Sequence, residues 1–158
     1  MKYNNVRIIM IILGISSSLF CKAQSNQTWV HSMKIETYNG GGMRDESSAV
    51  TITDSICTYA RRQSGKGDTA HFKLTKQELN DLLKKMQETD FMNITSGRNQ
   101  YTIHDMASTS VEFRNGRSEH RVGVGAKSEI KTGDPKAFRS FYDYVVGLAK
   151  KKTGPPTH

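Results

Sequence analysis

Apolar and polar residues alternate along several short segments of the chain, which is the two-residue period of a half-buried β-strand. In residues 28–38, the apolar side chains of Trp29, Met33 and Ile35 fall on one side of this alternation. Further strands are predicted over residues 49–53, 56–61 and 70–74. Turn-forming residues separate these strands, including the glycine-containing segment 64–68, so the pattern predicts an antiparallel meander.

The first predicted helix begins directly after the fourth strand. Thr75 and Glu78 have the spacing of a capping box, in which each side chain bonds a free backbone N–H of the other residue. One face of this helix is apolar through Leu79, Leu82, Leu83 and Met86. We expect the helix to end near Thr89 and Phe91 to close the same apolar cluster.

Asn115 and Gly116 predict a hairpin with a two-residue type I′ turn, because both residues tolerate the positive φ angles of that turn. The expected register places Arg114 opposite Arg117. One face of the hairpin then carries Thr109, Val111, Phe113 and Val122. The other face carries Glu112, Glu119 and Arg121, so we expect one buried and one solvated face.

The second predicted helix begins with Asp134 as its cap and Pro135 at its first position, where a missing N–H is harmless. Its apolar face contains Phe138, Phe141, Tyr142 and Val145. A long connection over residues 94–106 joins the first helix to the hairpin. We therefore predict an α+β fold, an antiparallel sheet of about six strands with both amphipathic helices packed on one face. The single domain is expected over residues 28–152, followed by a disordered tail over residues 153–158.

Residues 1–23 have the three parts of a secretory signal: a positive start, an apolar stretch and small residues before a cleavage point. We expect cleavage after Ala23, a disordered leader over residues 24–27, and no transmembrane segment in the mature chain. An alternative makes Cys21 the lipid-carrying residue of an anchored protein, although the bulky Phe20 before it disfavours that processing. In both cases the chain is expected to be exported, either to the periplasm or out of the cell.

The basic net charge becomes smaller once the predicted signal is set aside. Residues 1–23 contain Lys2, Arg7 and Lys22 and no acidic residue, so the formal charge falls from +8 to +5. The remaining charges mix both signs, apart from the basic run 150–152 near the end of the chain. A mixed surface does not form the basic stripe of a nucleic-acid interface, so we expect no nucleic-acid partner.

The sequence shows no converging set of catalytic or metal-binding residues. The histidines are scattered singly, whereas a zinc site needs three or four converging ligands. Gly65–Gly67 lacks the spacing of a phosphate-binding loop, and Cys57 is the single cysteine after residue 23, which excludes an internal disulfide. Gly123 and Gly125 are explained by a bulge or a close backbone approach. We predict no cofactor and no metal site, and we assign no catalytic residue.

Three consecutive glycines lie in the connection between the first two strands. This connection, residues 39–47, is longer than the two to five residues usual in a hairpin, which makes it a candidate contact loop. Because a strand follows the glycines, no helix N-terminus is present there to hold a phosphate. Tyr38 and Arg44 are the candidate binding residues of this loop.

The segment from Phe72 through Phe91, then Asp105, the strand pair around 115–116 and the proline-started helix resemble small exported domains and lipoproteins of bacteria. The families concerned have no known function. The resemblance covers roughly residues 50–149, and it implies a fold rather than a chemistry. It singles out Asp105, for which a turn-capping role is the simpler explanation. Many such domains contain a cysteine pair that this chain lacks, so no disulfide-based role is implied.

We expect a non-catalytic exported domain that binds a protein or an envelope component through its solvated sheet face or its loops. The candidate binding residues are Tyr38, Arg44, Asp105, Glu112, Arg114 and Arg121. The alternative is a small periplasmic or secreted hydrolase of cell-wall or carbohydrate material, with His104, Asp105 or Asp45 among its working groups. Segments 54–56 and 68–70 also match a bacterial O-glycosylation pattern, Asp followed by Ser or Thr and a small or aliphatic residue.

Overall fold

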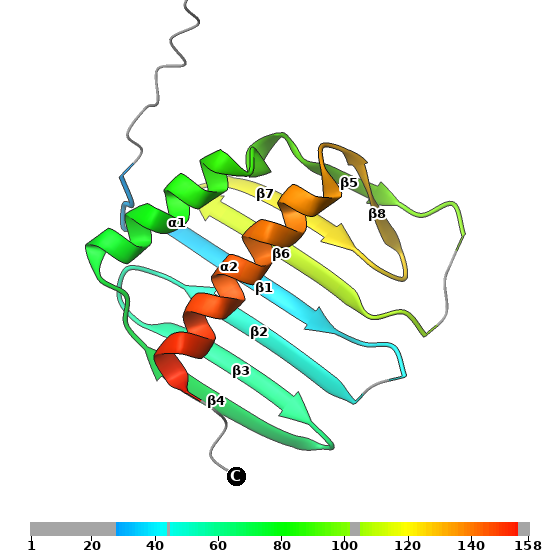
Figure 1. Cartoon of the computed structure of the whole chain (residues 1–158), viewed down its shortest axis with the longest axis horizontal. Coiled ribbons are helices and arrows are strands. Elements are labelled where there is room, and N and C mark those ends of the chain that lie inside the picture. Colours follow the sequence, from blue (N-terminus) through cyan, green and yellow to red (C-terminus); the bar gives the residue numbers. More distant parts are fainter. Residues whose placement is uncertain (1–27, 44, 102–104, 155–158) are drawn as a thin grey trace, which may run out of the picture.

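The computed structural model describes residues 28–43, 45–101 and 105–154 (Figure 1). Several predictions concern residues outside this part of the chain: the signal 1–23 with Cys21, the leader 24–27, Arg44, His104 and the tail residues 155–158. The described strands are β1 (Met33–Gly40), β2 (Glu46–Ile52), β3 (Cys57–Gln63), β4 (Lys66–Phe72), β5 (Thr95–Arg98), β6 (Ser108–Asn115), β7 (Ser118–Val124) and β8 (Ser128–Thr132). The described helices are α1 (Lys76–Glu88), the short 3₁₀ helix η1 (Phe91–Asn93) and α2 (Pro135–Thr153).

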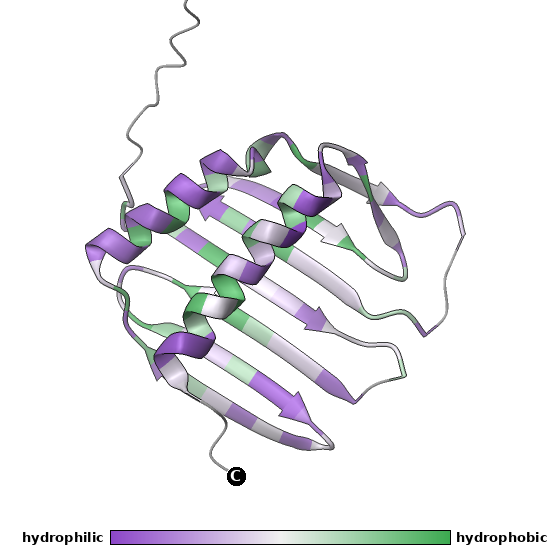
Figure 2. Cartoon of the chain, in the orientation of Figure 1, coloured by the Kyte–Doolittle hydropathy of each residue, from purple (hydrophilic) through white to green (hydrophobic). Residues whose placement is uncertain are grey.

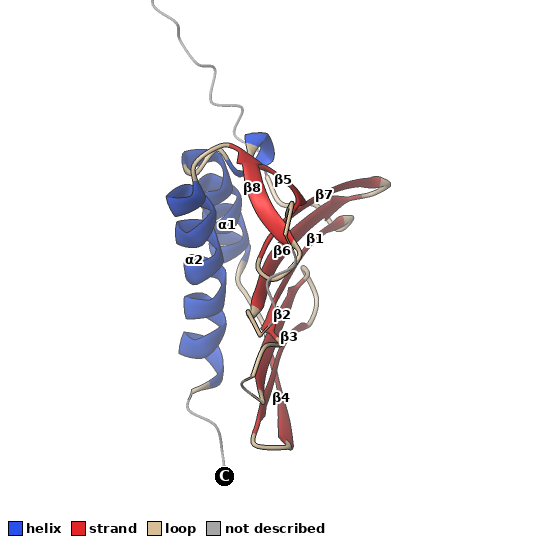
Figure 3. Cartoon of the chain, turned by 90° about the vertical axis from the view of Figure 1, so that its right-hand side faces the viewer, coloured by secondary structure: helices blue, strands red, loops and turns tan. Residues whose placement is uncertain are grey.

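Six strands form one antiparallel sheet in the order β4-β3-β2-β1-β6-β7. Both α-helices lie on the same side of this sheet (Figure 3), and α2 contacts β1, β2, β3 and β4. The predicted α+β fold, with an antiparallel sheet and helices on one face, is therefore confirmed. Neither helix lies on the opposite face.

The core lies between the helices and the sheet face that they cover. In Figure 2 the turns of α1 are hydrophobic on the side facing the sheet and hydrophilic on the outer side. The predicted apolar face of α1 is buried through Leu79, Leu82, Leu83 and Met86. From the sheet, Ile35 and Val111 are fully buried, and Phe91 of η1 closes the cluster as predicted.

The predicted capping box at the start of α1 is confirmed. Glu78 N donates to Thr75 Oγ1 at 3.2 Å, and Thr75 N donates to Glu78 Oε2 at 2.9 Å. The other carboxylate oxygen of Glu78 lies 2.7 Å from Nζ of Lys152 in the last turn of α2. Glu78 therefore caps one helix and joins it to the other.

Glu78→Gln is expected to lower the free energy of unfolding by about 1 kcal/mol at neutral pH. Hydrogen bonds from Lys152 and from the Thr75 backbone hold the pKa of Glu78 below its ordinary value. A carboxylate with a lowered native pKa contributes its full stability above the pKa of an unfolded glutamate, about 4.3. That contribution is lost as the pH falls through the native pKa. Urea denaturation measures the difference in free energy of unfolding between the unaltered chain and the Glu78→Gln variant. This difference should be smaller at about pH 3 than at about pH 7.

The control for this prediction is Glu88→Gln, in the last turn of the same helix. A carboxylate at a helix C-terminus meets the negative end of the dipole, which offsets the small contribution of its exposed ion pairs with Lys84 and Lys85, so this change should leave stability nearly unchanged. If the Glu78 and Glu88 variants respond alike to pH, the role assigned to the capping carboxylate is wrong.

The start of α2 also follows its prediction. Asp134 Oδ1 accepts a hydrogen bond from Lys136 N at 2.8 Å, and Pro135 occupies the first helical position. The helix extends to Thr153, a residue that the sequence pattern places in the tail. Gly154 ends it with a φ of 70°.

The first strand begins at Met33 rather than at Thr28, because a turn precedes it. Met33 N donates to the carbonyl oxygen of Val30 at 2.9 Å, which closes that turn. Trp29 is nevertheless only 9% exposed, and its backbone N–H bonds Asn80 Oδ1 of α1 at 3.0 Å. The apolar pattern at Trp29 therefore marks an anchor in the core and not a strand residue.

The turn between β6 and β7 differs from the predicted one. Its two loop residues are Gly116 and Arg117, and Asn115 pairs with Ser118. The positive φ of 59° lies at Gly116, the first loop position, where a type II′ turn requires it. Asn115 remains in the strand, where its Oδ1 accepts a hydrogen bond from Ser32 Oγ at 2.9 Å. The pairing moves by two residues, so the predicted buried and solvated faces of the hairpin are kept.

The sequence pattern does not predict β5 and β8, which pair with each other in a separate two-stranded sheet. Both strands contact β7, and Gly123 N of β7 donates to Ser96 Oγ of β5 at 3.0 Å. Their sequences, TSGR and SEIKT, contain a single large apolar residue, Ile130, so they lack the alternation of a half-buried strand. The predicted connection 94–106 therefore contains β5.

Candidate functional site

The sheet surface that points away from the helices is formed by alternate residues of the six strands, and we call it the open face. Tyr38 of β1 lies opposite Ala49 of β2 and Ser110 of β6. Glu36 lies in the adjacent row, opposite Glu112. Four of the predicted binding residues share this face: Tyr38, Glu112, Arg114 and Arg121.

Six charged residues from three neighbouring strands form a cluster on the open face: Lys34, Glu36, Glu112, Arg114, Glu119 and Arg121. We call it the charged cluster. Lys34 Nζ lies 2.9 Å from Glu36 Oε1. Arg114 Nε bonds the Glu112 carboxylate and lies 3.5 Å from the Glu119 carboxylate. The hydrogen bond with Glu112, reinforced by the surrounding carboxylates, raises the pKa of Arg114 above its ordinary value.

Glu36 and Glu112 are like charges on directly opposite residues, an arrangement that destabilises a sheet unless cations offset it. Here each carboxylate is bound to a cation of its own strand, Lys34 for Glu36 and Arg114 for Glu112. Glu112 is also well covered, with a side chain only 12% exposed. The pair is therefore held by its neighbours and does not present two unbound carboxylates to solvent.

Arg121 differs from the other cations of the charged cluster. It lies opposite Glu112 on β7 and is exposed. In the part of the chain that the structure describes, its guanidinium makes no hydrogen bond or ion pair. Its donors are therefore available to a ligand.

The connection between β1 and β2 is formed by residues 41–45, so it is shorter than the predicted 39–47 and has an ordinary hairpin length, because the two strands pair as far as Gly40 and Ser47. It borders an open hollow of about 350 Å³. Its lining residues are Tyr38, Gly41, Gly42, Met43, Asp45, Glu46, Ser47 and Arg62, and we call it the glycine-loop hollow. Asp45 Oδ1 lies 3.7 Å from Arg62 Nε, and the two side chains are 60% and 61% exposed. Gly41 and Gly42 have φ angles of 84° and 74°, which glycine adopts without steric cost.

Asp105 lies beside the same loop, since a Cβ on Gly42 would come within 2.7 Å of the Asp105 carbonyl oxygen. Arg44 and His104 lie outside the described residues. Asp45 and Asp105 are the remaining candidate working residues of the hydrolase alternative. Within the described ranges, no hydrogen bond joins their side chains.

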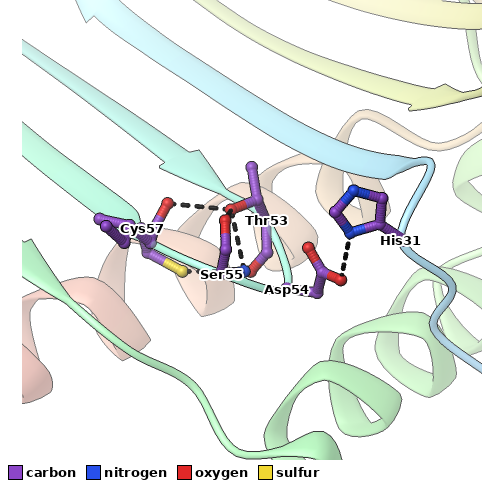
Figure 4. A network of polar contacts seen from close by, with 6 residues as sticks. His31, Thr53, Asp54, Ser55 and Cys57 are labelled. Carbon is purple, nitrogen blue, oxygen red and sulfur yellow. Dashed lines mark hydrogen bonds and ion pairs between the residues drawn. The ribbon is translucent and has the colours of Figure 1, made fainter.

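A second polar group lies at the opposite end of the sheet, before β1 and in the β2–β3 turn (Figure 4). His31 Nδ1 lies 2.7 Å from Asp54 Oδ2, a contact between residues 23 positions apart that the sequence gives no local signal for. Thr53 Oγ1 accepts a hydrogen bond from Ser55 N at 3.3 Å. Cys57 Sγ donates to the Thr53 carbonyl at 3.4 Å, and burial raises the pKa of this thiol. The thiol is therefore protonated at neutral pH and unsuited to nucleophilic attack.

Residues 28–43, 45–101 and 105–154 contain no group of three or more His, Cys, Asp and Glu residues that could hold a metal ion. Nor does any described helix have the length and apolar character needed to cross a membrane. No protein-family model matches the chain, and no curated protein matches its sequence.

Proposed function

We propose that this chain is an exported, non-catalytic domain whose open face binds a protein or another component of the bacterial envelope. The signal pattern of residues 1–23 and the resemblance to small exported bacterial domains support export. The observation that carries the binding proposal is Arg121, an exposed cation on the helix-free face of the sheet whose guanidinium makes no hydrogen bond or ion pair with the described residues.

An antiparallel sheet can present one face to water without binding anything, so the openness of this face alone does not support a function. Its side chains provide the support. Tyr38 is 45% exposed, and it shares the face with the exposed Arg121. Tyrosine and arginine are among the residue types that contribute most strongly to protein interfaces.

The charged cluster adds a pattern of charge to this surface. Glu36 and Glu112 form an acidic pair at its centre, and Arg114 and Arg121 lie on the side of β6 and β7. Complementary charge at an interface mainly sets partner choice and the rate of association. We therefore expect binding to weaken as the salt concentration rises.

Arg121→Glu is expected to reduce capture of an envelope component by roughly tenfold, because the change replaces an available donor group with a repelling charge. The measurement uses the immobilised chain and an envelope extract that retains both proteins and polysaccharides. Each captured component is quantified against the unaltered chain.

The matched control for this experiment is Lys84→Glu, an equal reversal of charge on α1, at a side chain that is 71% exposed. This control should leave capture unchanged. If the Arg121 variant captures every component as well as the Lys84 variant does, the charged cluster of the open face is not the contact surface.

A further inference from the structure

The side chain of Tyr38 has an unusual position on the open face. Its phenolic oxygen and Cζ lie 2.7 and 3.0 Å from the point that a Cβ on Gly40 would occupy. The tip of the ring therefore lies on the strand over Gly40, in space that any larger residue would take. Its neighbours across the sheet are Ala49 and Ser110, whose side chains are too small to cover an aromatic ring. A ring held in this way is a platform for a flat ligand.

The glycine-loop hollow begins at this platform, because Tyr38 is one of its lining residues. On its other side, the side chains of Asp45 and Arg62 are separated by 3.7 Å and are both mostly exposed. Within the described residues, neither side chain makes a second ion pair or a side-chain hydrogen bond. A carboxylate and a guanidinium in this state can accept and donate hydrogen bonds to the same ligand.

The composition of the hollow selects among ligand classes. An apolar small molecule is disfavoured, since such ligands need an enclosed and mainly apolar pocket. Among the described lining residues, Asp45 and Glu46 oppose the charge of Arg62, so a phosphate or another small anion is disfavoured too. A pyranose ring fits both the aromatic ring of Tyr38 and the polar pair of Asp45 and Arg62. One of its faces consists of C–H groups that pack on an aromatic ring, and its edge carries hydroxyls that donate to a carboxylate and accept from a guanidinium.

We propose that Tyr38 and the glycine-loop hollow bind a pyranose unit of a polysaccharide, with the sugar ring on Tyr38 and its hydroxyls on Asp45 and Arg62. This inference rests on the proposed function, because it names the ligand class of one end of the open face. The hollow of about 350 Å³ lies at the small end of the usual range for ligand sites, about 300–1,000 Å³. Its open shape admits an internal unit of a chain. The glycan strand of the cell wall and other β-linked polysaccharides share this chemistry.

Calorimetric titration of the protein purified after expression of the full chain tests the proposal. Three probes distinguish the polysaccharides that could supply the pyranose unit: soluble peptidoglycan glycan strands without peptide stems, chitohexaose and cellohexaose. At least one probe should bind saturably. Tyr38→Ala should weaken that binding by about tenfold, the effect of losing a favourable aromatic contact. Tyr38→Phe keeps the ring and should retain most of the affinity.

Two further variants complete the design. Arg62→Ala should weaken binding, since it removes the guanidinium donors from the hollow. Tyr144→Ala is the matched control, because Tyr144 is 36% exposed on α2, on the side of the sheet away from the open face. Absence of saturable binding for all three probes, or equal affinity of the Tyr38→Ala and Tyr144→Ala variants, would overturn the proposal. The Tyr38→Phe variant separates loss of the ring from loss of the hydroxyl.

The outcomes also distinguish this inference from the proposed function. If Arg121→Glu abolishes envelope capture while no saccharide binds, the proposed function stands and the saccharide site does not exist. If saccharide binding depends on Tyr38 while capture is unaffected by Arg121→Glu, the saccharide site stands and the charged cluster is not a contact surface.

Discussion

Phe91→Ala is expected to lower the free energy of unfolding by about 3–5 kcal/mol. Phe91 is fully buried, and its ring centroid lies 4.9 Å from that of Phe141 and 5.2 Å from that of His120. The ring therefore joins η1 to α2 and to β7. Because a domain of this kind is stabilised by only about 5–15 kcal/mol, the loss removes a large share of the total.

Urea denaturation followed by the fluorescence of Trp29, the single tryptophan, measures this effect. Met92→Ala is the matched control, since Met92 is the next residue of the chain and is 47% exposed. Its effect should stay within about 0.5 kcal/mol. A shift of the denaturation midpoint no larger for Phe91→Ala than for Met92→Ala would contradict the role of Phe91 in joining η1 to α2 and β7.

The two helices could be predicted closely because their signals are local. Thr75 and Glu78 bond each other across one turn, and Asp134 with Pro135 sets the start of α2 within two residues. Such contacts need no partner from another part of the chain. The strands of the large sheet were also predictable as a set, since alternation reports which residues of a strand face the core.

The register of the β6–β7 hairpin and the short strands β5 and β8 depend on contacts with distant residues, so they could not be predicted from the sequence. The side chain of Asn115 bonds Ser32, which lies 83 positions away, and this contact belongs to the observed turn rather than to the turn that the Asn–Gly pair favours. Strands β5 and β8 pair with each other and contact β7, although their own sequences carry almost no apolar pattern. Contacts between residues far apart in the sequence therefore determine both the β6–β7 turn and the pairing of β5 with β8.

The candidate site was predictable only in part, for the same reason. Alternation assigned Glu112 and Arg121 to the solvated side of the hairpin, and the structure agrees. The approach of Glu36 to Glu112 required β1 to pair with β6, a neighbour that the order of the chain does not indicate. The contact between Asp45 and Arg62 likewise required the paired ends of β2 and β3.

Gly125→Ala is expected to lower the free energy of unfolding by about 3 kcal/mol or more. Gly125 has a φ of 144°, and an added Cβ would lie 2.5 Å from Ser108 Cα and 2.6 Å from the Ala107 carbonyl oxygen. Both contacts are with backbone, which cannot move aside as a flexible side chain can. Gly125 also exchanges backbone hydrogen bonds with Ser128 and accepts one from Asn99 Nδ2 at 2.8 Å. A shift at this residue would therefore disturb the β7–β8 connection and the segment after β5 together.

Gly123→Ala should have the opposite sign, although only Val124, the last residue of β7, separates Gly123 from Gly125. An added Cβ at Gly123 meets Ser110 Cβ and the Thr109 carbonyl oxygen at 3.6 Å, an ordinary van der Waals distance. Its backbone conformation suits alanine, so the loss of unfolded-state entropy should raise stability by up to about 1 kcal/mol. Thermal and urea denaturation of both variants measure the contrast. Equal destabilisation by the two changes would show that strand flexibility, and not the close approach of the backbone at Gly125, accounts for these glycines.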